Sequence, residues 1–178
     1  MKVIQGKHKG TILKGFDIDG TRPTMDRVKE SLFAMIQDKI KDSIVLDLFS
    51  GSGNLGIEAL SMGAKKCYFV DKNSIACKTI KENLDKVKED GEVVKLDYLD
   101  ALKTFDTKFD FIFLDPPYNT DYINKSIELI TEYGLLNNHG YIVCETNDIN
   151  KVAKPNNYVV YKERKYGDKI VIILVKNM

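Results

Sequence analysis

The residues best placed to do chemistry form one short stretch, Asp115-Pro116-Pro117-Tyr118, directly after the apolar run of residues 109–114. The two prolines lack an N–H group and fix φ, so neither a strand ladder nor a helix continues through them. The stretch therefore offers a ligand one carboxylate, the carbonyl oxygens of Asp115 and Pro116, and an aromatic ring. These groups suit a planar molecule whose amino N–H bonds point at the acceptors while its plane stacks on Tyr118. The sequence predicts chemistry on an amino nitrogen, with these four residues as the catalytic set.

A glycine-rich turn lies upstream, between an apolar strand expected over residues 43–48 and a helix expected over residues 54–62. Gly51 and Gly53 allow a sharp turn and a close approach of a ligand to the backbone. The spacing Gly51-x-Gly53-x-x-Gly56, with Asp71 twenty residues after Gly51, also satisfies the dinucleotide-binding fingerprint. Taken alone, the pattern fits a nicotinamide-dependent oxidoreductase or any other nucleoside-binding doubly wound fold.

Acidic residues follow three consecutive predicted strands, and open α/β sheets bind ligands in the crevice at such strand ends. Asp47 would repel a pyrophosphate but suits the ammonium at the amino-acid end of S-adenosylmethionine. Asp71 can accept hydrogen bonds from both ribose hydroxyls. Asp97 can accept from an adenine amino group while Tyr98 covers the ring, although Asp100 is near enough to be the relevant acid instead. The sequence therefore favours S-adenosylmethionine, and the expected cofactor-binding residues are Asp47, Phe49, Ser50, Gly51, Gly53, Asp71, Asp97 and Tyr98.

Predicted strands and helices alternate along the chain. Strands are expected over residues 43–48, 66–70, 92–96, 109–114 and 141–144, and helices follow Thr24 and Asn73 as N-caps and cover residues 54–62 and 123–130. Residues 158–162 and 169–175 are expected to form a closing antiparallel hairpin around Gly167-Asp168. The predicted fold is a doubly wound, mostly parallel seven-stranded α/β sheet. We expect a single domain, with residues 1–40 as an N-terminal extension that carries a short β-hairpin (residues 2–5 and 11–13) and residues 41–178 as the core.

Composition excludes several classes of protein. No run approaches the roughly 18 apolar residues that a membrane-spanning helix needs. The first residues contain no apolar signal core, so a cytoplasmic protein is expected. The three cysteines and two histidines are too far apart to show a metal-ligand spacing, and no metal site is expected.

Positive charge gathers at both ends of the chain: the net charge is +1 overall, but +3 over residues 1–30 and +5 over residues 151–178. One interpretation is ordinary solvated charge, with the helix arginines paired to Asp26 or Glu30. The other is a rim that contacts the phosphates of a nucleic acid. The candidate RNA-binding residues are Lys7, His8, Lys9, Arg22 and Arg27.

Two motifs and four further segments resemble a known family. Residues 47–53 (Asp-Leu-Phe-Ser-Gly-Ser-Gly) resemble the first motif of class I S-adenosylmethionine-dependent methyltransferases, and residues 115–118 resemble their amino-methylating motif. Residues 3–10, 21–33, 56–64 and 165–168 are similar to the RsmD-type methyltransferases, which modify a guanine N2 in 16S ribosomal RNA. The similarity spans nearly the whole chain, although Ser50 and Asn54 stand where many members have Ala. It implies a Rossmann-like fold, S-adenosylmethionine as cofactor, and 16S rRNA in the small ribosomal subunit or its assembly intermediate as partner. Nothing in the sequence requires an oligomer, and a monomer is expected.

Three other functions stay open on the sequence alone. One is an adenine-N6 methyltransferase acting on DNA or RNA, since a similar Asp-Pro-Pro-Tyr motif occurs in the DNA enzymes. A DNA enzyme usually carries a separate recognition domain, however, and only about 40 residues precede the first cofactor strand here. A nicotinamide-dependent oxidoreductase would leave Asp47 and the two prolines unexplained. A non-catalytic RNA-binding assembly factor would keep the cofactor only as a structural ligand.

Overall fold

The molecule is built on one seven-stranded sheet with the strand order β3-β2-β1-β4-β5-β7-β6. The computed structural model describes residues 1–15 and 22–177, and the side chains of residues 1–15 and 25–177. The strands are β1 (Ile44–Asp47), β2 (Lys66–Val70), β3 (Glu92–Val94), β4 (Phe109–Leu114), β5 (Leu136–Thr146), β6 (Tyr158–Tyr166) and β7 (Lys169–Lys176). The first five are parallel to one another, and β7 runs antiparallel to both β5 and β6. The doubly wound sheet with a closing hairpin that the sequence predicts is therefore confirmed.

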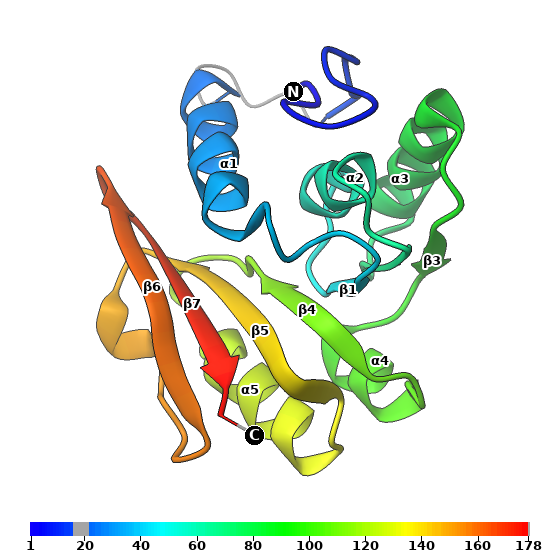
Figure 1. Cartoon of the computed structure of the whole chain (residues 1–178). Coiled ribbons are helices and arrows are strands. Elements are labelled where there is room, and N and C mark those ends of the chain that lie inside the picture. The colour runs from blue at the N-terminus through cyan, green and yellow to red at the C-terminus, as the bar shows by residue number, and fades with distance from the viewer. Residues whose placement is uncertain (16–21, 178) are drawn as a thin grey trace.

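Helices cover both faces of the sheet (Figure 1). They are α1 (Arg22–Ile36), α2 (Asn54–Ser61), α3 (Ser74–Val87), α4 (Tyr98–Thr104), α5 (Tyr122–Glu132) and the 3₁₀ turn η1 (Ile149–Lys151). The first three lie over one face, where α1 packs on the sheet with the Phe33 and Phe113 rings 5.6 Å apart. The last two α-helices lie over the other face, where Ile127 and Leu102 are buried against β4 and β5. Two apolar layers therefore hold the sheet rigid between them.

Capping side chains explain where α3 and α4 begin. Asn73 caps α3 as predicted, because its side chain accepts hydrogen bonds from the N–H groups of Ile75 and Ala76. The expected Thr24 cap is wrong, since α1 begins two residues earlier and Thr24 lies inside its first turn. Helix α4 is not among the predicted elements. Asp97 caps it by accepting a hydrogen bond from the N–H of Leu99, and β3 ends three residues earlier, at Val94.

The N-terminal segment is less regular than the predicted hairpin. Lys2 and Ile12 form a single antiparallel bridge, and neither predicted strand develops further. The segment is nevertheless fixed to the body of the protein, because Val3 and Leu13 are buried in the core beneath α1 and α2. The carboxylate of Glu58 on α2 also accepts hydrogen bonds from the N–H groups of Ile4 and Gln5.

The cysteines, the helix lengths and the grouping of metal-binding side chains can also be compared with the predictions from composition. Cys67, Cys77 and Cys144 are buried free thiols. Within residues 1–15 and 22–177, no helix combines the length and the apolar character needed to cross a bilayer. The described side chains also include no group of three or more His, Cys, Asp or Glu placed to hold a metal ion.

Candidate functional site

Acidic side chains from four parallel strands lie at the carboxyl edge of the sheet, and three of them, Asp47, Asp71 and Asp115, are residues that the sequence singles out. Asp47 is the last residue of β1, Asp71 follows β2, and Asp115 follows β4. A fourth acid, Glu145, is the penultimate residue of β5 and is almost fully buried. Two neighbouring cavities open at this edge, and Asp115 lines both of them.

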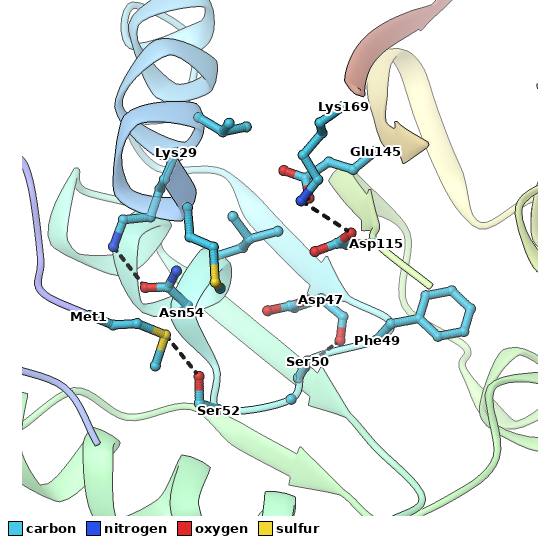
Figure 2. A pocket seen from close by; sticks show the side chains of 14 residues that line it. Met1, Lys29, Asp47, Phe49, Ser50, Ser52, Asn54, Asp115, Glu145 and Lys169 are labelled. Atoms are coloured by element: carbon cyan, nitrogen blue, oxygen red, sulfur yellow. Dashed lines mark hydrogen bonds and ion pairs between the residues drawn. The ribbon is translucent and has the colours of Figure 1, made fainter. Parts of the chain in front are cut away.

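The first cavity, of about 250 Å³, is rich in carboxylates and is covered by α1 and the N-terminus. Asp47, Asp115 and Glu145 point into it from the sheet, and Lys169 reaches in from the start of β7 (Figure 2). The remaining lining residues come from the glycine-rich turn, α1, α2 and the N-terminus: Met1, Met25, Val28, Lys29, Phe49, Ser50, Gly51, Ser52, Asn54 and Leu55. A cavity with three carboxylates suits a ligand that carries positive charge.

The second cavity, of about 480 Å³, has aromatic and apolar walls. Phe49, Tyr98 and Tyr122 form one cluster, with the Phe49 and Tyr98 ring centroids 5.1 Å apart and those of Tyr98 and Tyr122 4.7 Å apart. Asp71 and Asp97 supply acceptors on its rim. The lining residues are Leu48, Phe49, Gly51, Asp71, Lys72, Leu96, Asp97, Tyr98, Asp115, Pro116, Pro117, Thr120 and Tyr122. Such walls suit a flat heterocycle joined to a hydroxylated sugar.

The hydroxyl of Tyr98 is a buried polar group without a hydrogen-bond partner among the described residues. Leaving a buried donor unpaired costs roughly 1–3 kcal/mol, so such a group indicates a place where a ligand or water completes the site. Burial, helped by the nearby Asp121 carboxylate, raises the pKa of Tyr98 to about 12, and the hydroxyl keeps its proton. Tyr98 is thus available as a donor in the wall of the second cavity.

The glycine-rich turn joins the two cavities. Gly51 lines both, with φ of +57°, and its N–H donates to Asp71 Oδ2 at 3.0 Å. Gly53 is the N-cap residue of α2, with φ of +86°, and it lines neither cavity, so it allows the turn without contacting the space inside either cavity. Gly56 permits close packing of α2 on β2, since a Cβ there would lie 2.3 Å from the Phe69 ring.

Asp47 is a buried carboxylate held by the start of α2. Its Oδ2 accepts a hydrogen bond from the N–H of Gly56 at 3.1 Å, and Ser50 Oγ donates to its backbone carbonyl oxygen at 2.6 Å. Burial raises the pKa of Asp47 to about 7, and the nearby Glu145 carboxylate adds to the rise, which the Gly56 hydrogen bond opposes. The side chain is therefore poised between its neutral and charged forms, and a cationic ligand would favour the charged form.

Asp115, Glu145 and Lys169 form a charged cluster at the floor of the first cavity. Lys169 Nζ lies 3.0 Å from Glu145 Oε2 and 4.0 Å from Asp115 Oδ1. Burial and the Glu145 carboxylate raise the pKa of Asp115 well above its usual range, while Lys169 opposes the rise. Burial lowers the pKa of Lys169, but the two carboxylates outweigh it and the net pKa is raised, so Lys169 stays charged.

Neither Glu145 nor Lys169 is among the residues predicted from the sequence. A usable signal existed for Glu145, because it ends a buried strand in the same way as the predicted acids. The place of Lys169 could be known only from the sheet topology. Because β7 runs antiparallel to β5, the first residue of β7 lies at the edge where the parallel strands end.

Above the first cavity, Lys29 on α1 and Glu58 on α2 form a fully buried ion pair. Lys29 Nζ lies 3.0 Å from Glu58 Oε1, 2.7 Å from Asn54 Oδ1 and 2.6 Å from the carbonyl oxygen of Lys2. Burial lowers the pKa of Lys29, and the Glu58 carboxylate opposes that shift. The pair therefore ties α1, the start of α2 and the N-terminal segment together over the cavity.

Other predicted site residues lie outside the two cavities. Tyr118 is about half exposed and lines neither of them. Asp100 is exposed on α4, whereas Asp97 lines the second cavity.

Four of the candidate RNA-binding residues, Lys7, His8, Lys9 and Arg27, line neither of the two cavities. Glu89, which follows α3, pairs with both Lys7 and His8: its Oε1 lies 2.7 Å from Lys7 Nζ and 2.8 Å from His8 Nε2. Lys9 and Arg27 are exposed, and the side chain of Arg22 lies outside the described residues.

Comparison with known proteins places the whole chain in one group. The family described as "Conserved hypothetical protein 95" matches residues 1–175. "Ribosomal RNA small subunit methyltransferase D" of Haemophilus influenzae is 37% identical over 172 residues, which cover 94% of this chain and 89% of the relative. The protein of the same name from Escherichia coli K12 is 31% identical over 169 residues, which cover 94% and 85%. A solved structure from Escherichia coli, provisionally named a methyltransferase, superposes with a TM-score of 0.90 at 28% identity over 99% of this chain and 97% of that one.

Proposed function

The chain belongs to the family described as conserved hypothetical protein 95, the RsmD-type methyltransferases, and from this premise we propose that it methylates the N2 amino group of a guanine in 16S ribosomal RNA with S-adenosylmethionine as methyl donor. The relatives named for methylation of small-subunit ribosomal RNA support the choice of substrate. The substrate would be the small subunit or an assembly intermediate of it. The cytoplasmic location and the monomeric state stay predictions.

The observation that carries the proposal is the position of Asp115 between the two cavities. Bound S-adenosylmethionine would supply an activated methyl group on a sulfonium. Its amino-acid end fits the carboxylate-rich first cavity, where Asp47 would face the ammonium. Its adenosine fits the aromatic second cavity, with Asp71 and Asp97 as acceptors on the rim and the unpaired Tyr98 hydroxyl as a donor. The residues present therefore suit this cofactor.

Asp115 and Pro116 would act on the acceptor. The lone pair of a guanine amino group is delocalised into the ring, so the nitrogen must become pyramidal to attack. Two acceptors aimed at its hydrogens, the Asp115 carboxylate and the Pro116 carbonyl oxygen, favour that geometry and stabilise the positive charge that develops. Preorganised electrostatic stabilisation of this kind contributes about 3–4 kcal/mol in measured cases. The base must leave its stack to reach this position.

Glu145 and Lys169 would position and tune Asp115. A base is needed for the proton that the nitrogen loses, and Asp115 can receive it only while ionised. The Glu145 carboxylate makes Asp115 more basic, whereas the positive charge of Lys169, 4.0 Å away, opposes the rise of the Asp115 pKa and favours its ionised form. The groups that act on the charge of Asp115 are Glu145, Lys169 and Asp47.

We expect Glu145→Gln to move the acid limb of the pH profile of kcat to lower pH. The change keeps the shape of the side chain and removes the negative charge that raises the pKa of Asp115. Asp115 then stays ionised at more acidic pH, because Lys169 also has one carboxylate fewer to pair with. The check is kcat measured between pH 5 and 9 for the wild type and the variant. Glu132→Gln, on the exposed surface of α5, is the matched control, and an unshifted or oppositely shifted limb would contradict the role of Glu145.

We expect the dissociation constant for S-adenosylmethionine to rise as the pH falls through about 7. Asp47 titrates there in the free protein, and its neutral form cannot pair with an ammonium group. Below the pKa, affinity should fall by up to about tenfold per pH unit. Calorimetric titrations at pH 6, 7 and 8 measure this, and Asp47→Asn should bind more weakly with little pH dependence. Asp100→Asn serves as the control, and a wild-type affinity that is flat across this range would count against Asp47 as the ammonium partner.

The proposed function is tested by transfer of tritiated methyl groups from S-adenosylmethionine to 30S particles from a strain that lacks the modification, with protein-free 16S rRNA and duplex DNA assayed alongside. Label in the ribosomal RNA is the expected result, with 30S particles preferred over protein-free RNA. Label confined to DNA would overturn the substrate and favour an adenine-N6 enzyme. Binding of NADH in place of S-adenosylmethionine would overturn the cofactor.

A further inference from the structure

Strand β6 presents two different faces, and one of them is continuous with the catalytic floor. Residues opposite each other in antiparallel strands point to the same side of the sheet. Arg164 is opposite Val171, which is in turn opposite Glu145, so Arg164 and Glu145 share a face. Two strand spacings separate them, about 10 Å. Lys162 lies on this face too, because its partner Ile173 is buried in the same apolar layer as Val171.

This face of β6 carries positively charged side chains, whereas the other face carries both an acidic and a basic side chain. Arg164 is exposed, and the Lys162 ammonium lies 5.5 Å from the centre of the Tyr161 ring. Lys169 continues the line of cations into the first cavity. Glu163, the acid of this strand, is opposite Ile172 and points to the other side of the sheet. Lys165 points there as well, opposite Ile170.

The position of β6 makes this face accessible beside the catalytic site. The strand is the last in the sheet order, so no further strand within residues 1–15 and 22–177 pairs with its outer edge. The β6–β7 hairpin extends alongside α1 (Figure 1). Met25 and Val28 of α1, Lys169 of the hairpin and Asp115 all line the first cavity, so this cavity brings α1, the hairpin and Asp115 together.

We propose that the RNA segment next to the target guanine lies along the Lys162–Arg164 face of β6, with its phosphates on these two cations and the flipped base entering between α1 and the hairpin. This inference rests on the proposed function and names the docking surface for its substrate. Alternate residues of a strand are about 7 Å apart, which is similar to the spacing of successive phosphates in an extended nucleic-acid chain. The N-terminal candidates Lys7 and His8 are paired with Glu89 and lie outside both cavities.

The test compares Lys162→Glu/Arg164→Glu with Lys165→Glu/Lys154→Glu. The control makes the same change of charge at Lys165, on the other side of the sheet, and at Lys154, an exposed residue between η1 and β6. Binding to 30S particles is measured by filter retention at several salt concentrations. We expect the first variant to bind at least tenfold more weakly and to lose about 1–2 units of the slope of log K against log salt. The control should change by less than threefold. Affinity for S-adenosylmethionine should be unchanged in both, which shows that the fold and cofactor site are intact.

Two results would overturn the surface assignment: full binding by the Lys162→Glu/Arg164→Glu variant, or an equal loss in the control. Lys162→Ala/Arg164→Ala is a milder variant for the case in which charge reversal disturbs the strand. We expect it to weaken binding at least threefold. Failure of the proposed function looks different, because wild-type protein would then leave the ribosomal RNA unmethylated whatever the binding data show. Methylation by the wild type with normal binding by both β6 variants would keep the function and reject this surface.

Discussion

Replacing Asp115 with alanine is expected to lower kcat for methyl transfer by about 10²–10³-fold, the effect of removing one preorganised acceptor from an active site. The side chain lies where the two cavities meet, and it supplies one of the two acceptors proposed for the amino group. Its pKa is raised by burial and by Glu145, which makes it a better base than an exposed aspartate. Alanine loses both properties and leaves the carbonyl oxygen of Pro116 as the only acceptor of the pair. Single-turnover transfer with saturating cofactor and RNA substrate measures the effect on the chemical step.

Binding measurements separate a catalytic role of Asp115 from a structural one. The dissociation constants of Asp115→Ala for S-adenosylmethionine and for 30S particles should stay within a few-fold of the wild type. Asp100→Ala, which removes an exposed acid of α4, is the matched control and should keep full activity. An Asp115→Ala variant with more than a third of the wild-type kcat would contradict the proposed chemistry. Loss of transfer with retained particle binding would also exclude a purely binding role for the protein.

Replacing Lys29 with methionine is expected to lower the free energy of unfolding by about 3–5 kcal/mol, because it leaves the Glu58 carboxylate buried without a counter-charge. Lys29 and Glu58 are almost completely inaccessible to solvent, and methionine cannot replace the hydrogen bonds to Asn54 and to the carbonyl oxygen of Lys2. This loss is a large fraction of the stability of an ordinary domain. Urea unfolding at pH 7 measures it.

Two further variants identify the cause of that loss. The double variant Lys29→Met/Glu58→Gln removes both charges and should regain part of the lost stability, since no uncompensated charge stays buried. Lys39→Met breaks an exposed pair with Asp38 and should change the free energy of unfolding by less than about 1 kcal/mol. A Lys29→Met effect no larger than that of Lys39→Met would mean that the buried pair contributes little.

The predictions that held depend on local patterns. The strand of residues 109–114 and the helix capped by Asn73 were predictable because apolar spacing and a capping side chain specify them without distant contacts. The acids at the strand ends were predictable because parallel strands bring their carboxyl ends to one edge whatever their neighbours are. The boundary between an extension and a core near residue 40 stays a prediction.

The features that the sequence did not indicate depend on contacts between distant segments. Whether Lys29 is solvated or buried depends on Glu58 and on the N-terminal segment that covers both. Lys169 reaches the catalytic floor only because β7 reverses direction beside β5. His8 is a further example. Its predicted RNA contact requires an imidazole without a partner in the protein, but the ring is hydrogen-bonded to Glu89, which lies 81 residues away in the sequence.

The most direct test of the account is the position of the transferred methyl group. Ribosomal RNA methylated with a deuterated methyl donor is digested to nucleosides and analysed by mass spectrometry against standards. We expect label in N2-methylguanosine in the wild-type reaction and its near absence with Asp115→Ala. Label in N6-methyladenosine, on a ring atom of a base or on a ribose hydroxyl would contradict the assignment of Asp115 and Pro116 to a guanine amino group.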